Sequence, residues 1–109
     1  MNTYRPFLLL RARPKAESRE RFRVWFEQVH LRDVAGIPGI ATIRSGSTRG
    51  GTQLGLYSFE SADVVQGSLA SPEAAYSRGT WEQWASELEE LLIEMWAPVF
   101  PLPPYESAN

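Results

Sequence analysis

One stretch of the 109-residue chain, from Phe22 to Ile43, constrains the fold more than any other, because it joins an amphipathic helix to a strand through a fixed turn. Pro38 forces the residue before it out of helical conformations, so the helix must end there. Gly39 supplies the backbone freedom that a tight turn needs. Apolar side chains before the turn recur at steps of three and four residues, which lines one helical face against a core; they are Phe22, Trp25, Phe26, Val29 and Val34.

The single histidine of the chain, His30, lies near the end of this helix. The spacing predicts that it sits beside Phe26 and Val29, at the edge of the apolar stripe. An imidazole exchanges protons near neutral pH and can serve as a general acid or base. Asp33, three residues further along the same helical face, can hold the imidazole in one tautomer. The alternative is a structural histidine that hydrogen-bonds a carbonyl at the helix end.

Two strands are expected to be apolar on both faces, which requires cover on both sides of a sheet. The first carries Phe7–Leu10, and the second places Leu54 and Leu56 on one face with Tyr57 and Phe59 on the other. The glycine-rich residues 46–51 join two strands and do not open a helix, so they indicate a hairpin and not a phosphate-binding loop. The expected strands are 4–13, 41–48 (a polar edge strand), 52–60 and about 93–100; the expected helices are 17–35, 62–70, 72–79 and 80–92.

This order of elements is β-α-β-β-α-β, the ferredoxin-like arrangement of the α+β class, with a four-stranded antiparallel sheet and helices on one face. The uncovered sheet face needs a partner, and we predict a homodimer in which two such sheets pack together as a dimeric α/β barrel. Residues 1–109 are expected to form a single domain. The proline-rich segment 101–109 is expected to be a surface tail or an arm onto a neighbouring subunit.

Composition excludes several classes of function. The chain contains no cysteine, which removes disulfides and thiolate chemistry. A net charge of −2 gives no case for nucleic-acid binding, and the longest apolar run is four residues, too short to span a membrane. The first residues lack a signal-peptide pattern, so a cytoplasmic location is expected.

The charge is unevenly distributed along the chain. Residues 1–50 hold ten Arg and Lys against four acids, whereas residues 51–109 hold one against nine. The two halves can attract each other within one fold, or they can provide head-to-tail complementarity between subunits.

The residues around the helix-to-strand turn are similar to a known signature. The segment Trp25–Ile40 follows the pattern W-F-x-x-V-H-x-x-x-V-A-G-I-P-G-I. This pattern resembles the dimeric α/β-barrel proteins of the EthD type and the 4-methylmuconolactone methylisomerases, which are related to small aromatic polyketide cyclases. The resemblance implies a pocket for a small molecule beside the sheet, and a catalytic role for His30. The tyrosine–histidine pairs of polyketide cyclases have no clear match, and Tyr76 is the tyrosine we consider for that role.

Aromatic side chains suggest the walls of a pocket for a flat ligand, since such pockets are mostly apolar with few polar groups. Core packing is the alternative reading for each. Arg44 and Tyr57, on neighbouring strands, can provide a fixed cation and a hydroxyl near a ligand enolate, or can instead be surface or dimer contacts. The wall candidates are Trp25, Phe26, Trp81 and Trp84.

We expect no cofactor and no metal, because one histidine and no cysteine leave only carboxylates as ligands. The acidic residues from Glu87 to Glu94 are interpreted as a solvated helix face. The resemblance also covers haem degradation, for which His30 is the sole candidate axial ligand. The leading hypothesis is a cofactor-free enzyme that cyclises or isomerises an aromatic, lactone or polyketide-like molecule. The alternatives are a cofactor-independent monooxygenase and a non-catalytic binding or assembly module, whose sign would be a plugged pocket and a paired, buried His30.

Overall fold

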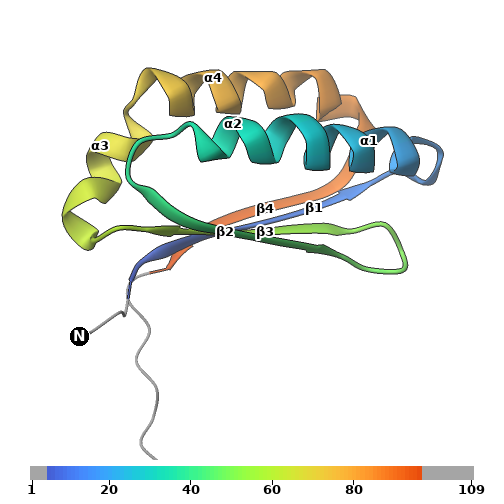
Figure 1. Ribbon diagram of the computed structural model, residues 1–109. Coiled ribbons are helices and arrows are strands. Elements are labelled where there is room, and N and C mark those ends of the chain that lie inside the picture. The colour runs from blue at the N-terminus through green and yellow to red at the C-terminus, as the bar shows by residue number, and fades with distance from the viewer. Residues whose placement is uncertain (1–4, 97–109) are drawn as a thin grey trace, which may run out of the picture.

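The computed structural model describes residues 5–96, which form a four-stranded antiparallel sheet in the order β2-β3-β1-β4 (Figure 1). All the helices lie on one face of this sheet (Figure 1). The architecture is therefore the predicted α+β ferredoxin-like fold. In chain order the elements are β1 (Phe7–Pro14), a 3₁₀ turn (Ala16–Ser18), α1 (Arg19–Trp25), a π-helical turn (Phe26–His30), α2 (Leu31–Ala35), β2 (Ile40–Ser47), β3 (Gln53–Phe59), a 3₁₀ turn (Ala62–Val64), α3 (Val65–Leu69), α4 (Pro72–Thr80), a 3₁₀ segment (Trp81–Glu87) and β4 (Leu88–Trp96).

The central strands alternate between the two faces as predicted. On β3 every second residue is buried beneath the helices, including Tyr57 and Phe59, while Leu54 and Leu56 face the other way and are half-buried. On β1 the buried Leu10 faces the helices. β2 is an edge strand, and it forms an antiparallel hairpin with β3 through the glycine-rich loop.

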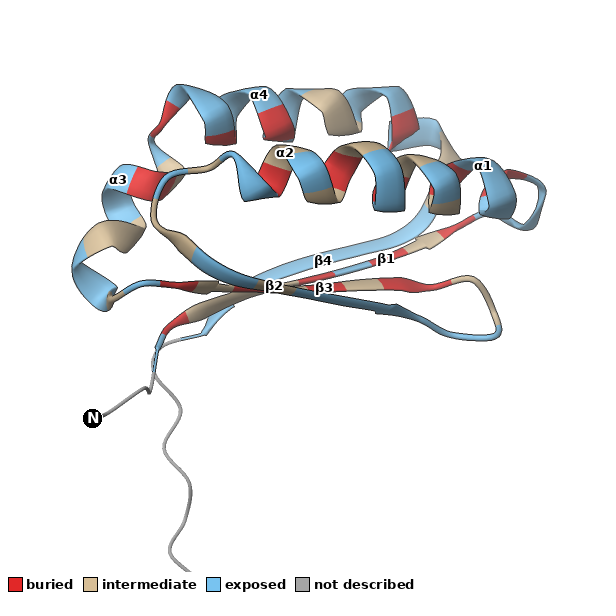
Figure 2. Ribbon diagram, in the orientation of Figure 1, coloured by how far each residue is buried: buried red, intermediate tan, exposed pale blue. Residues whose placement is uncertain are grey.

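No described segment lies over the sheet face opposite the helices (Figure 2), and large apolar side chains on this face are partly exposed. Phe7 and Trp96 are directly paired across β1 and β4, and their rings stack with centroids 6.1 Å apart. Trp96 is 44% exposed and Leu92, on the same face, is 39% exposed. Half-exposed large apolar groups on a sheet face indicate a contact surface.

The turn after the first helix forms where the sequence predicts it. Gly39 adopts a φ of +91°, a left-handed conformation that glycine reaches without a steric penalty. The Ser68 hydroxyl donates a hydrogen bond to the carbonyl of Pro38. That contact fixes the entry into β2 against α3.

The last helix and strand differ from the prediction. α4 continues through Gly79, the 3₁₀ segment ends at Glu87, and β4 begins at Leu88 instead of near residue 93. The cause is long-range pairing, since β4 follows β1 along its whole length and reaches Pro14. Glu89, Glu90 and Glu94 therefore lie on a strand, so their interpretation as a solvated helix face is wrong.

The core between sheet and helices is dominated by aromatic rings. Phe22, from α1, packs edge-on against Trp84 with ring centroids 5.0 Å apart, and both side chains are buried. Two ion pairs connect the basic first half to the acidic second half, which supports attraction within the fold as the reason for the charge asymmetry; they are Arg11–Glu90 at 3.3 Å and Arg21–Glu87 at 3.4 Å.

Two further observations concern residues 5–96 only. No helix in this range combines the length and apolar character that crossing a bilayer requires. No three His, Asp or Glu side chains in this range come together as a metal site would require. The proline-rich segment 101–109 lies outside the described residues.

Candidate active site

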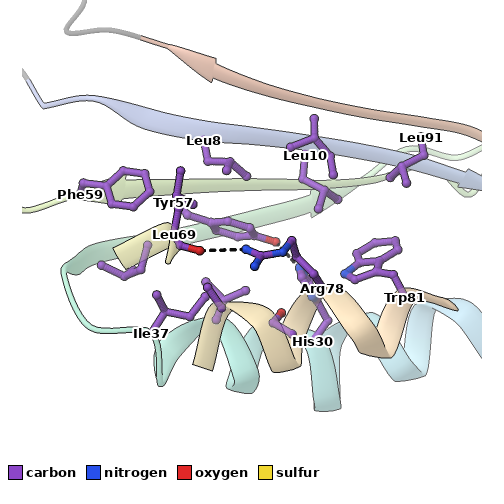
Figure 3. Close-up of a pocket in the computed structure, with 15 residues that line it drawn as sticks. Leu8, Leu10, His30, Ile37, Tyr57, Phe59, Leu69, Arg78, Trp81 and Leu91 are labelled. Carbon is purple, nitrogen blue, oxygen red and sulfur yellow. Dashed lines mark hydrogen bonds between the residues drawn. The ribbon is translucent and has the colours of Figure 1, made fainter. Parts of the chain in front are cut away.

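A cavity of about 320 Å³ lies between the sheet and the helices. Apolar side chains of β1, β3 and β4 form one wall, and residues of α2, α3 and α4 form the other (Figure 3). This volume lies at the lower end of the range for small-molecule pockets, about 300–1,000 Å³. The polar side chains in its lining are His30, Tyr57, Ser77 and Arg78.

His30 and Tyr57 form a buried hydrogen-bonded pair in the cavity wall. The His30 Nε2 and Tyr57 Oη atoms are 2.7 Å apart. The residues are 2% and 3% exposed, and they come from elements that lie 27 positions apart in sequence. Both residues are candidates from the sequence, but no sequence pattern predicts that they form a hydrogen bond with each other.

A π-helical turn brings His30 inside. The backbone N–H of Leu31 bonds the carbonyl of Phe26, five residues back, where a regular helix would bond four residues back. Regular helical spacing predicted His30 at the edge of the apolar stripe. The wider turn interrupts that spacing, and the His30 side chain is buried instead. π-turns within α-helices often occur at functional sites.

Gly55 leaves the space that Tyr57 occupies. Both residues lie on the helix-facing side of β3, two positions apart. A Cβ atom at Gly55 would lie 2.1 Å from Tyr57 Oη and 2.4 Å from Cζ, far inside normal contact. The Tyr57 ring thus leans back over a position without a side chain, and this orientation aims its hydroxyl at His30.

Burial sets the protonation of the pair. It lowers the pKa of His30 to about 4, because a charged imidazolium loses its hydration in the apolar cavity wall. The same desolvation raises the pKa of the Tyr57 phenol. At pH 7 the pair is therefore a neutral imidazole bonded to a neutral phenol. His30 Nδ1 is buried and has no hydrogen-bond partner within residues 5–96.

Asp33 does not hold the imidazole. Its Oδ2 atom is buried and, like His30 Nδ1, it has no partner in the described part of the chain. Asp33 and Tyr76 together border a separate surface depression between α2 and α4, and Tyr76 is 67% exposed. The predicted support of His30 by Asp33 is therefore wrong, and Tyr76 lies outside the cavity.

The aromatic candidates separate into three kinds of position. Trp81 lines the cavity and stands edge-on to His30, with ring centroids 4.9 Å apart. Trp25 stacks on the imidazole at 5.6 Å, and Phe26 packs against it at 4.9 Å, but neither lines the cavity. Trp84 belongs to the core beside Phe22.

Arg44 lies on the far face of the sheet. It is exposed and pairs across the strands with Leu56, whose side chain points away from the helices. Within one chain, Arg44 and Tyr57 therefore do not face the same ligand, contrary to the prediction.

The cation at the cavity is Arg78, which the sequence reasoning missed together with Ser77. Both extend from α4. One signal for Arg78 was present, since it is the single basic residue of positions 51–109. Its isolation in an acidic half of the chain sets it apart from the other arginines.

The sheet order and the one-sided helix layer define the ferredoxin-like fold, and solved structures with the same fold match the chain. No family model matches the chain, and no curated protein matches it in sequence. Rv0793 from Mycobacterium tuberculosis matches with a TM-score of 0.67 and 15% identity over 90% of this chain and 98% of its own.

Two other solved structures share this fold. An EthD-family protein from Bacillus halodurans matches with a TM-score of 0.65 and 14% identity over 82% of this chain and 96% of its own. A variant of SnoaB, a cofactor-independent oxygenase from Streptomyces nogalater, matches with a TM-score of 0.67 and 13% identity over 93% of this chain and 99% of its own. At these identities the likeness establishes the fold, including the predicted resemblance to EthD-type proteins, and it does not transfer an activity.

Proposed function

We propose that this protein is a cofactor-free enzyme that binds a small, largely apolar molecule with an enolisable carbonyl or a phenolic hydroxyl and removes a proton from it. The observation that carries this proposal is the His30–Tyr57 pair, a neutral imidazole 2.7 Å from a phenol in the wall of an apolar cavity. A pocket with an apolar lining and a few convergent polar groups suits such a ligand.

The proton passes to His30 through Tyr57 in this proposal. Tyr57 Oη accepts the acidic proton of the substrate, from the carbon beside a carbonyl or from a phenolic hydroxyl, while its own proton moves to the lone pair of His30 Nε2, which leaves an enolate or phenolate, a neutral Tyr57 and an imidazolium. A buried imidazole with a low pKa resists protonation in the empty site. The enolate that forms beside it favours the charged imidazole, so both charges develop together.

The enolate has two possible fates. Without oxygen, return of the proton at another carbon gives isomerisation, and attack of the enolate carbon on a carbonyl of the same molecule, with return of the proton to the new alkoxide, gives cyclisation. Reaction of the carbanion with O₂ gives instead the oxidation catalysed by a cofactor-independent monooxygenase. The fold likeness to SnoaB supports the second fate. Oxygen consumption in the presence of substrate separates the two.

A non-catalytic binding or assembly module is the competing proposal. It expects two features, a paired and buried His30 and a cavity filled by side chains, and the site has the first of them. His30 is buried and already bonded to Tyr57, as that reading expects. The cavity in front of the pair is open rather than filled by side chains, which favours the enzyme.

The test follows oxygen with an electrode and products by mass spectrometry, using anthrones, naphthols and unsaturated lactones as substrates. His30→Gln, which preserves side-chain volume, should lower turnover by about 10²- to 10⁴-fold, the usual share of a general base. The matched control is Gln28→Ala, an exposed position two residues earlier on the same helix. Undiminished turnover in His30→Gln would refute the proposal.

We also propose that two copies associate through the sheet face opposite the helices. The half-exposed Leu92 and Trp96 on this face support the proposal. Charges of opposite sign lie on its two edge strands, Arg44 on β2 and Glu94 on β4, so a two-fold axis can bring them together. Light scattering should give a mass near twice 12.3 kDa at micromolar concentration, and a clean monomer would contradict this association.

A further inference from the structure

Arg78 is the cationic side chain among the described residues that line the cavity. The rest of the lining is apolar apart from Ser77 and the neutral His30–Tyr57 pair. Figure 3 shows Arg78 reaching from α4 to the carbonyl of Leu69, which accepts a hydrogen bond from its Nη1 atom at 3.0 Å. Arg78 is exposed at the rim of the cavity, and this bond holds its guanidinium there.

Arg78 makes no ion pair within residues 5–96, where the ion pairs involve other arginines. A guanidinium carries five N–H donors, and one bond to a backbone carbonyl leaves most of them available. Such a planar group binds a carboxylate through two parallel hydrogen bonds.

Acidic residues near Arg78 determine how an anion would be recognised. Glu82, Glu89 and Glu90 share with Arg78 a depression beside the cavity, although none of them comes within ion-pair distance of it. Their charge opposes the long-range attraction of small anions. Binding must therefore combine direct contact with Arg78 and burial of an apolar body in the cavity.

We propose that the ligand is an aromatic or polyketide-like carboxylate whose carboxylate pairs with Arg78 while its apolar body fills the cavity. The inference rests on the proposed function, because it uses the same cavity and orients the body of the ligand toward His30 and Tyr57. Arg78 then selects anions among molecules of similar shape.

The experiment measures binding of naphthoate and of its neutral isostere naphthamide, followed by quenching of tryptophan fluorescence and by calorimetry. Trp81 in the cavity wall provides the optical signal. Wild type should bind naphthoate about 10- to 100-fold more tightly than naphthamide, the range for a hydrogen bond to a charged group. Arg78→Gln should remove this preference and leave naphthamide binding unchanged. Arg49→Gln, at an exposed loop position, is the matched control and should keep the preference.

The other outcomes separate the role of Arg78 from the role of the cavity. Equal affinity of wild type for the two probes, or an equal loss of both in Arg78→Gln, refutes the carboxylate and leaves the proposed function standing. A variant that loses turnover with unchanged affinity assigns Arg78 to the developing enolate charge and also refutes it. Failure of both probes to bind at millimolar concentration refutes the cavity as a ligand site, and with it both proposals.

Discussion

Gly55→Ala should disable the site without touching either residue of the His30–Tyr57 pair. The new Cβ would lie 2.1 Å from Tyr57 Oη, so the hydroxyl must retreat by about 1.3 Å to reach the 3.4 Å at which ordinary contact begins. Its hydrogen bond to His30 Nε2, now 2.7 Å long, does not survive a shift of that size.

The expected loss of stability follows from three contributions. Overpacking of a buried site costs about 1–3 kcal/mol, and the lost hydrogen bond costs about 1 kcal/mol. Alanine recovers about 0.5–1 kcal/mol over glycine in a strand. The free energy of unfolding should therefore fall by about 1–3 kcal/mol, and the thermal midpoint by about 4 °C or more.

The assay combines urea unfolding with turnover, and two variants make it specific. Gly67→Ala is the control for the same chemical change, since an added Cβ there meets nothing within 4 Å. Gly55→Ala in a Tyr57→Ala background should cost nothing or stabilise, because the clash partner is gone. An equal cost in both backgrounds would refute the account of Gly55 as the space for Tyr57.

Three further outcomes are expected. The pKa of His30 is about 4 in the folded protein and an ordinary 6.5 in the unfolded chain, so the unfolded chain binds more protons between these pH values. The contribution of neutral His30 to the free energy of unfolding should therefore be fully present above pH 6.5 and should fall by up to about 3 kcal/mol on acidification to pH 4. Urea unfolding of His30→Gln should lack this pH-dependent contribution. Gly39→Ala should cost at least about 1–2 kcal/mol in the same assay, because φ is +91° and Ser68 Oγ lies 2.1 Å from the new Cβ; an unchanged midpoint would contradict the strain. Leu56→Glu should yield monomers in light scattering if the open sheet face joins two copies, and persistent dimers would locate the interface elsewhere.

The features that sequence predicts correctly are those governed by local periodicity. Alternation on β3 separates Leu56 from Tyr57, and the Pro38–Gly39 turn follows from the restricted backbone of one residue and the freedom of the other. Those signals need no knowledge of distant parts of the chain.

The structural features that the sequence does not predict depend on long-range contacts or on a single inserted residue. A bulge between Ile40 and Thr42 changes the parity of β2, so alternation alone does not tell which face Arg44 occupies. Leu88 fits a helical repeat, yet pairing with β1 draws it into a strand. The π-turn that contains His30 leaves no periodic signal, because it interrupts the helical period itself.

The presence of one histidine in the chain makes the site directly observable by magnetic resonance. Its ring protons give a single set of imidazole signals, which need no assignment by mutagenesis. Rings of Trp25 and Trp81 lie close to that imidazole, so their ring currents should move its signals well away from random-coil positions. A molecule entering beside Tyr57 would change these signals, and binders can be screened on the unmodified protein before any reaction is known.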